Sequence, residues 1–399
     1  MSIETLTESI LSRMSSIGKW QSKFFVDLVL TWLHLRGRYT FENLSRQSRL
    51  SAVSYRKWFS KGFDFKQFNH LLLEAHTQKE RIWAFDPSFI SKSGKHTYGL
   101  GYFWSGCAQA IKQGLEIASL ALVDAYNHTA FHYHASQTLL SKGENLLAHY
   151  ARLLTGQAPE LLKLSAYLTV DAYFAKFSFI EPLIQAGLHV ITRLRDDAVL
   201  FYPYLGPKRA GRGRQRKYQS KVNSKQIDLS YFRPCIREQD WQAFEACLYC
   251  KSLKRLLKVV LVHTYRPDGS LKSSKLFACT DTTISGMDLW YYYHLRFQIE
   301  FLYRDAKQLL GLHHCQSRQE KRLDFQFNFS LTLISLAKIV HYLCLPIAQR
   351  GAFSLQNIKT QYANEHLLHR FFQAFGICAH TAKKNPAYQQ LANYAKIAA

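Results

Sequence analysis

The order of apolar runs between residues 80 and 199 restricts the fold of this chain more than any other feature. These runs read as three strands, a helix, a strand, a helix and a last strand. Successive strands predict antiparallel neighbours, and a helix between two strands predicts a crossover that adds a parallel strand. The sequence therefore predicts an α/β fold in which flanking helices cover a mixed five-stranded sheet.

Two of these predicted strands end in an aspartate. The first, "RIWAFDPSFI", is expected to stop at Asp86-Pro87, and the fourth, "SAYLTVDAYFAK", ends at Asp171. The second and third strands are expected in "YGLGYFWSGCAQ" and "GLEIASLALVDAYNHTAFHYHAS". If the strands of Asp86 and Asp171 are neighbours, both carboxylates project from the same edge of the sheet.

The rest of the chain divides by composition and periodicity. Residues 1–78 read as helical, residues 79–199 form the first part of the core, and residues 200–286 read as a β-rich insertion. Residues 287–322 return to the core with a long helix, and residues 323–399 read as helical again. The insertion contains a predicted basic loop, "GPKRAGRGRQRK", whose cations include Lys208, Arg209, Arg212 and Arg214.

The stretch "WYYYHLRFQIEFLYRDAKQLLGL", residues 290–312, reads as one long amphipathic helix. At about 100° per residue its polar side chains fall within about 80° of arc, and an apolar stripe lies opposite. A carboxylate thus sits among three cations and a phenol on one face. The members of this polar stripe are Tyr293, Arg296, Glu300, Arg304 and Lys307.

The balance of charge indicates a polyanionic partner. Fifty-two Lys and Arg face 28 Asp and Glu, which gives a formal net charge of +24. With 47% hydrophobic residues the chain can still build a large core. Nucleic acid is the leading candidate partner, with an acidic membrane surface as the alternative. A basic protein whose charge serves only solubility remains the simplest competing interpretation.

The N-terminal region contains a candidate DNA-binding element. "TFENLSRQSRLSAVSYRKWFSKGF" reads as two short helices joined by a turn, with Ser51 as the cap of the second. This pattern is typical of a helix-turn-helix whose second helix meets DNA. The candidate contacts on that helix are Tyr55, Arg56, Lys57 and Lys61.

Asp86, Asp171 and Glu300 together would form a site for hard divalent cations. Carboxylates gathered at one point repel each other unless a cation neutralises them, and oxygen ligands favour Mg²⁺ or Mn²⁺. Two such ions can activate a nucleophile and stabilise the leaving oxygen of a phosphodiester. In the purely structural alternative, the aspartates cap local elements and Glu300 pairs with neighbouring arginines. The competing carboxylates are Asp124, Asp196, Asp197 and Asp305.

The intervals from Tyr293 to Lys307 resemble the Tyr-Arg-Glu-Lys motif of one group of DDE transposases from bacterial insertion sequences. The regions around Asp86 and Asp171 are also similar to the two Asp regions of that family. The resemblance implies an RNase H-like core, with the first Asp on strand one, the second on strand four and the Glu on a later helix. It also implies a β-rich insertion before that helix.

The same resemblance implies roles for individual residues. Asp86, Asp171 and Glu300 would bind two Mg²⁺ ions, with Mn²⁺ as an alternative. Arg296 and Lys307 would hold phosphates beside the cleaved bond, and Tyr293 would position a phosphate or stack on a base. Arg304 is an additional cation that this sequence places on the same stripe.

The implied function is cut-and-paste DNA transposition in the bacterial cytoplasm. The partners would be double-stranded DNA, as terminal inverted repeats and as target, and a second subunit in a homodimeric synaptic complex. Two alternatives remain, namely a transposase-derived DNA-binding protein without catalysis and a structure-selective nuclease. No membrane span is expected, because "SLTLISLAKIVHYLCL" is interrupted by Lys338 and His341 and is short.

Three smaller motifs leave their alternatives open. Trp241 and Trp290 are each a candidate for holding a flipped base or for the core. Cys247 and Cys250 form a C-x-x-C without a second pair, so buried or edge-strand thiols compete with a zinc site. "HYH" at 132–134 suggests two histidines on one face of a strand, for which a metal role is the minor alternative.

Overall fold

The computed structural model of the protein describes residues 1–207 and 215–397. The N-terminal region forms α1 (Ile3–Ser12), α2 (Lys19–His34), α3 (Phe41–Arg46), α4 (Ala52–Lys61) and α5 (Phe65–His76). The next segment forms β1 (Arg81–Ser91), β2 (Gly101–Ser105), β3 (Ala110–Asp124), β4 (Thr129–Gln137), α6 (Leu146–Thr155) and α7 (Ala158–Leu162). It continues through β5 (Tyr167–Val170), η1 (Ala172–Phe174), α8 (Phe177–Gln185) and β6 (His189–Leu194).

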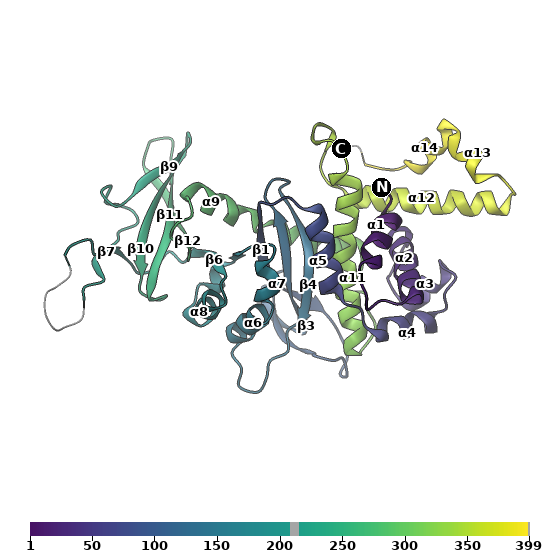
Figure 1. Ribbon diagram of the computed structural model, residues 1–399, viewed down its shortest axis with the longest axis horizontal. Helices are drawn as coiled ribbons and strands as arrows, with labels where there is room; N and C mark the ends of the chain where they lie inside the picture. The colour runs from purple at the N-terminus through teal and green to yellow at the C-terminus, as the bar shows by residue number, and fades with distance from the viewer. Residues whose placement is uncertain (208–214, 398–399) are drawn as a thin grey trace.

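The second half of the chain begins with strands and ends with helices. The strands are β7 (Leu200–Pro203), β8 (Tyr218–Lys221), β9 (Arg233–Arg237), β10 (Trp241–Cys250), β11 (Arg255–Tyr265) and β12 (Leu271–Cys279). Then follow α9 (Gly286–Leu295), α10 (Gln298–Leu309), α11 (Glu320–Lys338), η2 (Ile339–Leu343), η3 (Ile347–Gln349), α12 (Leu355–Ala374), α13 (Ala379–Lys384) and α14 (Pro386–Ala392). Strands β7 to β12 lie at one end of the elongated molecule, and α1 to α4 lie toward the other (Figure 1).

The prediction of a mixed α/β fold is confirmed. Strands β4, β3, β1, β5 and β6 lie side by side in that order, with β1 antiparallel to β3 and parallel to β5. Helices α6, α7 and α8 provide the crossovers that make β5 and β6 parallel additions. This arrangement is consistent with an RNase H-like domain.

The sheet extends well beyond the five strands that the sequence predicted. Strand β12 pairs with β6, and the sheet continues through β11 and β10 to β7 and β8, so it has 12 strands. Within the described part of 200–279 the regular elements are strands. The insertion is therefore joined to the core through backbone hydrogen bonds rather than through a linker.

Two strand predictions were wrong. Strand β1 does not stop at Asp86-Pro87 but continues to Ser91, because Pro87 faces Ala118 of β3 where β5 has already ended. The predicted third strand is two strands, β3 and β4, joined by a turn at 125–128. Asp171 therefore follows the fifth strand in chain order, since the short β2 pairs only with the start of β3.

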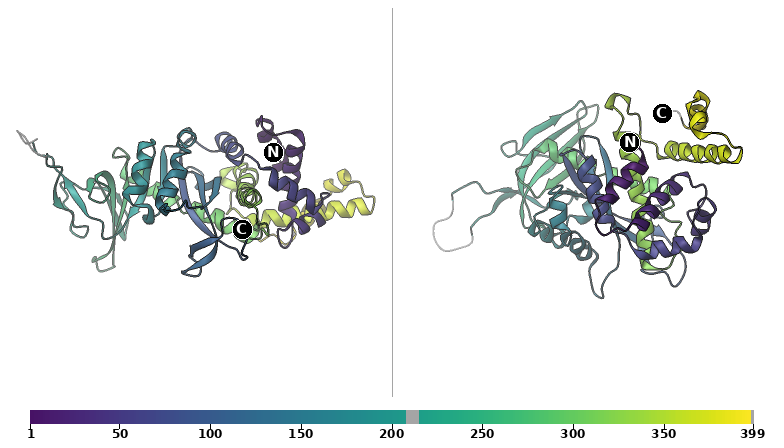
Figure 2. Two further views of the ribbon diagram at one scale, coloured as in Figure 1. Left: turned by 90° about the horizontal axis from the view of Figure 1, so that it is seen from below. Right: turned by 45° about the vertical axis from the view of Figure 1, so that its right-hand side comes forward.

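Helix α11 forms the centre of the helical layer: it packs on β4 beside α5, and α1 to α4 lie on its other side (Figures 1 and 2). Three of its buried polar side chains bond the backbone of β4, namely Asn328, Ser335 and Lys338. Asn328 Nδ2 donates to the carbonyl of Ala135 at 3.0 Å, and the amide of His132 donates to Ser335 Oγ at 2.8 Å. These directional bonds fix the helix on the sheet where apolar packing alone would let it slide.

The same helix gives the one candidate membrane span among the described residues. The stretch Glu320–Leu343 is 24 residues, long and apolar enough to cross a bilayer by length and composition. The sequence-based judgement that it is too short was wrong. However, 94% of its most apolar 18-residue window is buried inside the protein, as in the core helix of a globular domain.

Tyr39 joins three parts of the chain at the end of α10. Its hydroxyl donates to the carbonyl of Leu309 at 2.7 Å, and Lys359 of α12 donates to the same hydroxyl and to the carbonyls that end α2. Burial lowers the pKa of Lys359 to about 7. The N-terminal and C-terminal helices thus meet at the C-terminal end of α10.

Gly311 is required at this junction. It adopts φ +62°, and a Cβ there would lie 2.4 Å from the Tyr39 ring. We expect Gly311→Ala to lower the free energy of unfolding by about 2–3 kcal/mol, through left-handed strain and steric overlap. Gly106→Ala, where a Cβ meets nothing within 4 Å, is the control and should change stability by no more than about 0.5 kcal/mol in urea unfolding. Equal effects of the two substitutions would contradict this role for Gly311.

Candidate active site

Asp86 and Asp171 lie on neighbouring parallel strands. The register pairs Ala84 of β1 with Thr169 of β5, so the two aspartates, each two residues further on, come level with each other. Thr192 Oγ1 donates to the carbonyl of Asp171 at 3.0 Å, which fixes the end of β5 against β6. The structure thus brings together the two carboxylates that the sequence placed on neighbouring strands.

Glu300 reaches the same place from helix α10. The opposite face of that helix is buried through Ile299, Leu302 and Ala306. Tyr303 extends toward the sheet, and its hydroxyl donates to the carbonyl of Asp86 at 2.6 Å. This buried hydrogen bond ties the helix that carries Glu300 directly to the strand that carries Asp86. Tyr303 was not predicted as part of the site, although at about 100° per residue it falls beside Arg296 at the border of the polar stripe.

The three carboxylates act on each other electrostatically. Burial raises the pKa of Asp86 to about 7; the negative charges of Glu300 and Asp171 add to that rise, while Arg296 and, more weakly, Lys307 oppose it. A buried carboxyl facing two others is typical of sites that bind a cation or transfer a proton. Asp171 is exposed and the Glu300 side chain is 39% exposed, so the cluster is open to solvent.

The helix predicted over 290–312 is interrupted beside this cluster. Helix α9 ends at Leu295, a turn follows, and α10 begins at Gln298. The turn contains Arg296, whose side chain is 14% exposed and donates to Glu300 Oε1 at 3.0 Å. No glycine or proline marks this break, so no local feature of the chain predicts it.

The other members of the polar stripe divide into two groups. Lys307 Nζ donates to Ser88 Oγ of β1 at 2.8 Å. Ser88 is two residues beyond Asp86 on that strand, so this bond holds the Lys307 ammonium near Asp86. Burial raises the pKa of Tyr293, and Arg296 and Asp171 both act on that phenol, which places it beside the cluster as well. Arg304 is different, because it pairs with Asp305 at 2.9 Å and lies over the Phe301 ring. Arg304 follows Glu300 by one turn of α10, but its contacts are with Asp305 and Phe301 rather than with the carboxylates of the cluster.

The competing carboxylates have structural partners. Asp124 is fully buried and accepts hydrogen bonds from the amides of Gln78 and Asn127, which closes the turn between β3 and β4. Asp305 is buried against Arg304. Asp196 and Asp197 are exposed and pair with nearby arginines. None of the four contributes to the electrostatics of Asp86.

The donor set fits a hard divalent cation, although the carboxylates are not gathered around one point. Over 1–207 and 215–397, no group of three His, Cys, Asp or Glu side chains is arranged closely enough to hold a metal ion. Glu300 and Asp171 nevertheless raise the pKa of Asp86, and neighbouring carboxylates favour positive charge between them. Asp86, Asp171 and Glu300 are therefore the residues that would hold Mg²⁺ or Mn²⁺.

The predicted basic loop cannot be placed. Lys208, Arg209, Arg212 and Arg214 lie outside the described residues.

The N-terminal region contains the predicted pair of short helices, α3 and α4, but not all of the side chains predicted to contact DNA are on its surface. The Ser51 side chain caps α4 by accepting a hydrogen bond from the amide of Ser54 at 3.2 Å. Tyr55, however, is 1% exposed and packs against Phe24 in the core, so it was wrongly predicted to face DNA. Lys57 and Lys61 are exposed and remain available to a phosphate backbone.

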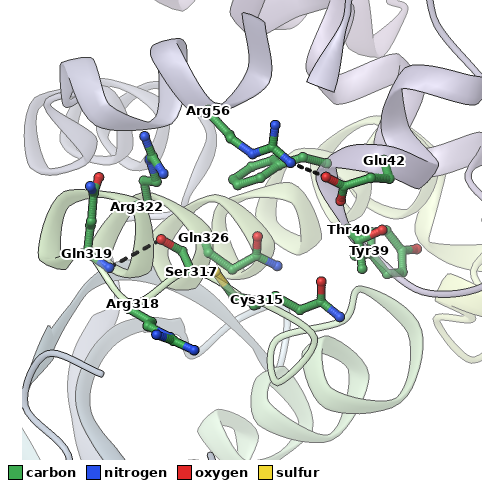
Figure 3. A pocket seen from close by; sticks show the side chains of 12 residues that line it. Tyr39, Thr40, Glu42, Arg56, Cys315, Ser317, Arg318, Gln319, Arg322 and Gln326 are labelled. Carbon is green, nitrogen blue, oxygen red and sulfur yellow. Dashed lines mark hydrogen bonds and ion pairs between the residues drawn. The ribbon is translucent and has the colours of Figure 1, made fainter. Parts of the chain in front are cut away.

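A cavity of about 380 Å³ separates this helix pair from the segment leading into α11 (Figure 3). Three arginines line it, but each is oriented differently. Arg56 pairs with Glu42, Arg322 Nε donates to Ser60 Oγ at 2.7 Å, and Arg318 points away from both. The cations do not converge on a single anion position.

The remaining motifs have ordinary contacts. Trp241 of β10 and Trp290 of α9 stack at 5.2 Å and 18°, which joins the insertion to the helix preceding the cluster. Cys247 is exposed and Cys250 is buried, so the two thiols do not form a common pair of ligands. His132 Nε2 lies 3.1 Å from the buried Asn328 side chain, a structural hydrogen bond.

Comparison with known proteins adds one finding. No curated protein matches the chain. The family model described as a transposase DDE domain matches residues 145–336, a segment that contains Asp171, Glu300 and the whole insertion. This part of the chain is therefore similar to a transposase DDE domain.

Proposed function

We propose that this protein is a cut-and-paste DNA transposase that cleaves and joins DNA at terminal inverted repeats with Mg²⁺. The observation that carries the proposal is the placement of three carboxylates on β1, at the end of β5 and on α10, where Glu300 and Asp171 both raise the pKa of Asp86. The net charge of +24 and the transposase family match support DNA as the substrate.

Each step of the proposed reaction forms one P–O bond and breaks another: cleavage hydrolyses a phosphodiester, and joining exchanges one phosphoester bond for another. In cleavage, the oxygen of water attacks phosphorus and the bond to the 3′ oxygen breaks, leaving a 3′-hydroxyl and a 5′-phosphate. In joining, that 3′-hydroxyl attacks a target phosphodiester and releases a target 3′-hydroxyl. Divalent ions held by Asp86, Asp171 and Glu300 would supply the Lewis acidity that both steps need.

The flanking side chains would hold the DNA in line. Lys307, positioned by Ser88 next to Asp86, would contact a phosphate as a point charge. Tyr293, which packs against Phe277 at 4.8 Å, would place its hydroxyl on the side of Asp171. Arg296 would bind a phosphate with its planar fork once it is free of Glu300.

The test is a strand-transfer assay with Mg²⁺ and pre-cut end DNA. A joined product supports transposition. Cleavage without joining would instead favour a structure-selective nuclease, and DNA binding that is unaffected by Glu300→Gln, with no cleavage in the wild type, would leave a non-catalytic DNA-binding protein.

The salt dependence of DNA binding should report on Arg296. In the presence of Ca²⁺, we expect Arg296→Ala to weaken duplex binding and to reduce the slope of log K against log salt by about one unit, because one phosphate contact is lost. Arg296→Lys keeps the charge and should keep the slope. Fluorescence anisotropy over a salt series measures both, and an unchanged slope in Arg296→Ala would remove this residue from the phosphate contacts.

Pairing of two subunits through α12 is part of the proposal. Helix α12 lies at the periphery of the molecule (Figure 1). Three apolar side chains at helical spacing stay exposed at its C-terminal end, namely Leu367 (62%), Phe371 (48%) and the C-cap Phe375 (68%). We expect Phe371→Glu to weaken dimer formation on DNA at least about tenfold, because a buried charge opposes an apolar contact. Analytical ultracentrifugation of the DNA complex measures this, and an unchanged dimer fraction would exclude this face.

A further inference from the structure

Arg296 occupies an unusual position for a residue expected to contact DNA. Its guanidinium donates to Glu300 at 3.0 Å and is only 14% exposed. Burial by itself would lower the pKa of Arg296, but Asp86, Tyr293, Glu300 and Asp171 overcome that effect and raise it. All three carboxylates of the cluster therefore act on this one guanidinium.

Arg296 in turn acts on the carboxylate of Asp86. Among the charges that act on Asp86, Arg296 is the strongest that stabilises its ionised form, ahead of Lys307. Arg193 also acts on the neighbouring Tyr293, but it pairs with the exposed Asp196. Arg296 is thus the main positive charge on the carboxylate cluster.

This position explains why the carboxylates are not gathered as metal ligands. Across the described ranges no three of them share a point where an ion could bind, and Glu300 is turned toward Arg296. A guanidinium keeps its proton under all ordinary conditions, so it cannot leave by deprotonation. It can leave only by moving, and the turn between α9 and α10 places it outside both helices.

We infer that Arg296 is the internal counter-cation of the metal-free carboxylate cluster, that a divalent ion displaces it, and that the displaced guanidinium then binds a DNA phosphate. The inference rests on the proposed function in taking a divalent ion as the ligand of this cluster. It adds a coupling, because one side chain cannot neutralise the carboxylates and bind a phosphate at the same time. Metal binding and DNA binding should then strengthen each other reciprocally.

Mn²⁺ titration by calorimetry tests the competition without any activity measurement. We expect Arg296→Gln to bind Mn²⁺ about tenfold more tightly than the wild type, since the competing charge is gone. Arg296→Lys retains a charge and should restore at least part of the weaker wild-type affinity. Arg304→Gln is the matched control, because Arg304 pairs with Asp305 instead, and its Mn²⁺ affinity should equal that of the wild type.

A second measurement tests the coupling, with a duplex of arbitrary sequence as the probe. Ca²⁺ should raise the affinity of the wild type for the duplex by a larger factor than it does for Arg296→Gln. Equal Mn²⁺ affinities in the wild type and Arg296→Gln, or a weaker one in the variant, would overturn the inference while leaving the proposed function intact. If none of the proteins binds Mn²⁺, the metal-dependent function fails and the inference fails with it.

Discussion

Replacing Glu300 by glutamine should reduce strand transfer by about 10³-fold or more while leaving DNA binding nearly unchanged. The reason is that a metal ligand contributes to charge stabilisation in the transition state. Such stabilisation is worth several kcal/mol, and each factor of ten in rate corresponds to about 1.4 kcal/mol. The amide keeps the shape of the side chain and can still accept a hydrogen bond from Arg296.

The comparison requires a carboxylate that is charged but remote from the cluster. Asp197 is exposed and pairs with Arg195 at 3.2 Å, so Asp197→Asn should retain wild-type strand transfer. If Glu300→Gln transfers strands as well as Asp197→Asn does, Glu300 is only the partner of Arg296. Duplex binding measured by anisotropy separates a loss of chemistry from a loss of substrate.

The second large effect is on stability. Without metal ions, Asp86→Asn should stabilise the protein at pH 8. Folding raises the pKa of Asp86 from 3.8 to about 7, chiefly through burial. The folded state therefore binds a proton more tightly than the unfolded state, and the stabilisation from that proton is complete below about pH 4 and lost as pH rises through 7. Above pH 7 the wild type carries a charged carboxylate in an unfavourable site.

The size of this effect follows from the shift. Three pKa units at about 1.36 kcal/mol each set an upper limit of about 4 kcal/mol, and partial solvent access reduces the expected gain to about 1–3 kcal/mol. Urea unfolding at pH 4 and pH 8 with EDTA measures it, and the gain should be largest at pH 8. Asp197→Asn should show neither effect. A variant destabilised at pH 8 would indicate that Asp86 is stabilised as a charged partner of Arg296.

Much of the site could be predicted because it depends on strand neighbours and helical periodicity. Asp86 and Asp171 were each expected at the end of a strand, and at one sheet edge if those strands were neighbours; the structure makes β1 and β5 parallel neighbours. The wheel placed Tyr293, Arg296 and Lys307 beside Glu300. In the structure Arg296 bonds Glu300, Lys307 bonds Ser88 near Asp86, and Asp171 acts on Tyr293. The relative placement of side chains along a helix is preserved across a short turn when the apolar face of the helix still packs on the sheet.

The remaining features depend on tertiary contacts that local patterns do not record. The turn at Arg296 has no breaking residue, and Tyr55 was taken for a DNA contact although its ring completes an aromatic core with Phe24. The turn between β3 and β4 did have a sequence signal, because Asp124 and Asn127 form a side-chain turn. The prediction of one continuous apolar strand did not take these two residues into account. The pairing of β12 with β6 joins strands far apart in sequence and could not be anticipated.

The central claim is that Asp86, Asp171 and Glu300 bind one set of divalent ions. The most direct test is Mn²⁺ calorimetry on the wild type and on Asp86→Asn, Asp171→Asn and Glu300→Gln, with Asp197→Asn as the control. Each of the three cluster variants should bind Mn²⁺ at least about tenfold more weakly, as expected when a site loses a ligand or its support. Undiminished Mn²⁺ affinity in all three would contradict the claim and leave Glu300 as a salt-bridge partner of Arg296.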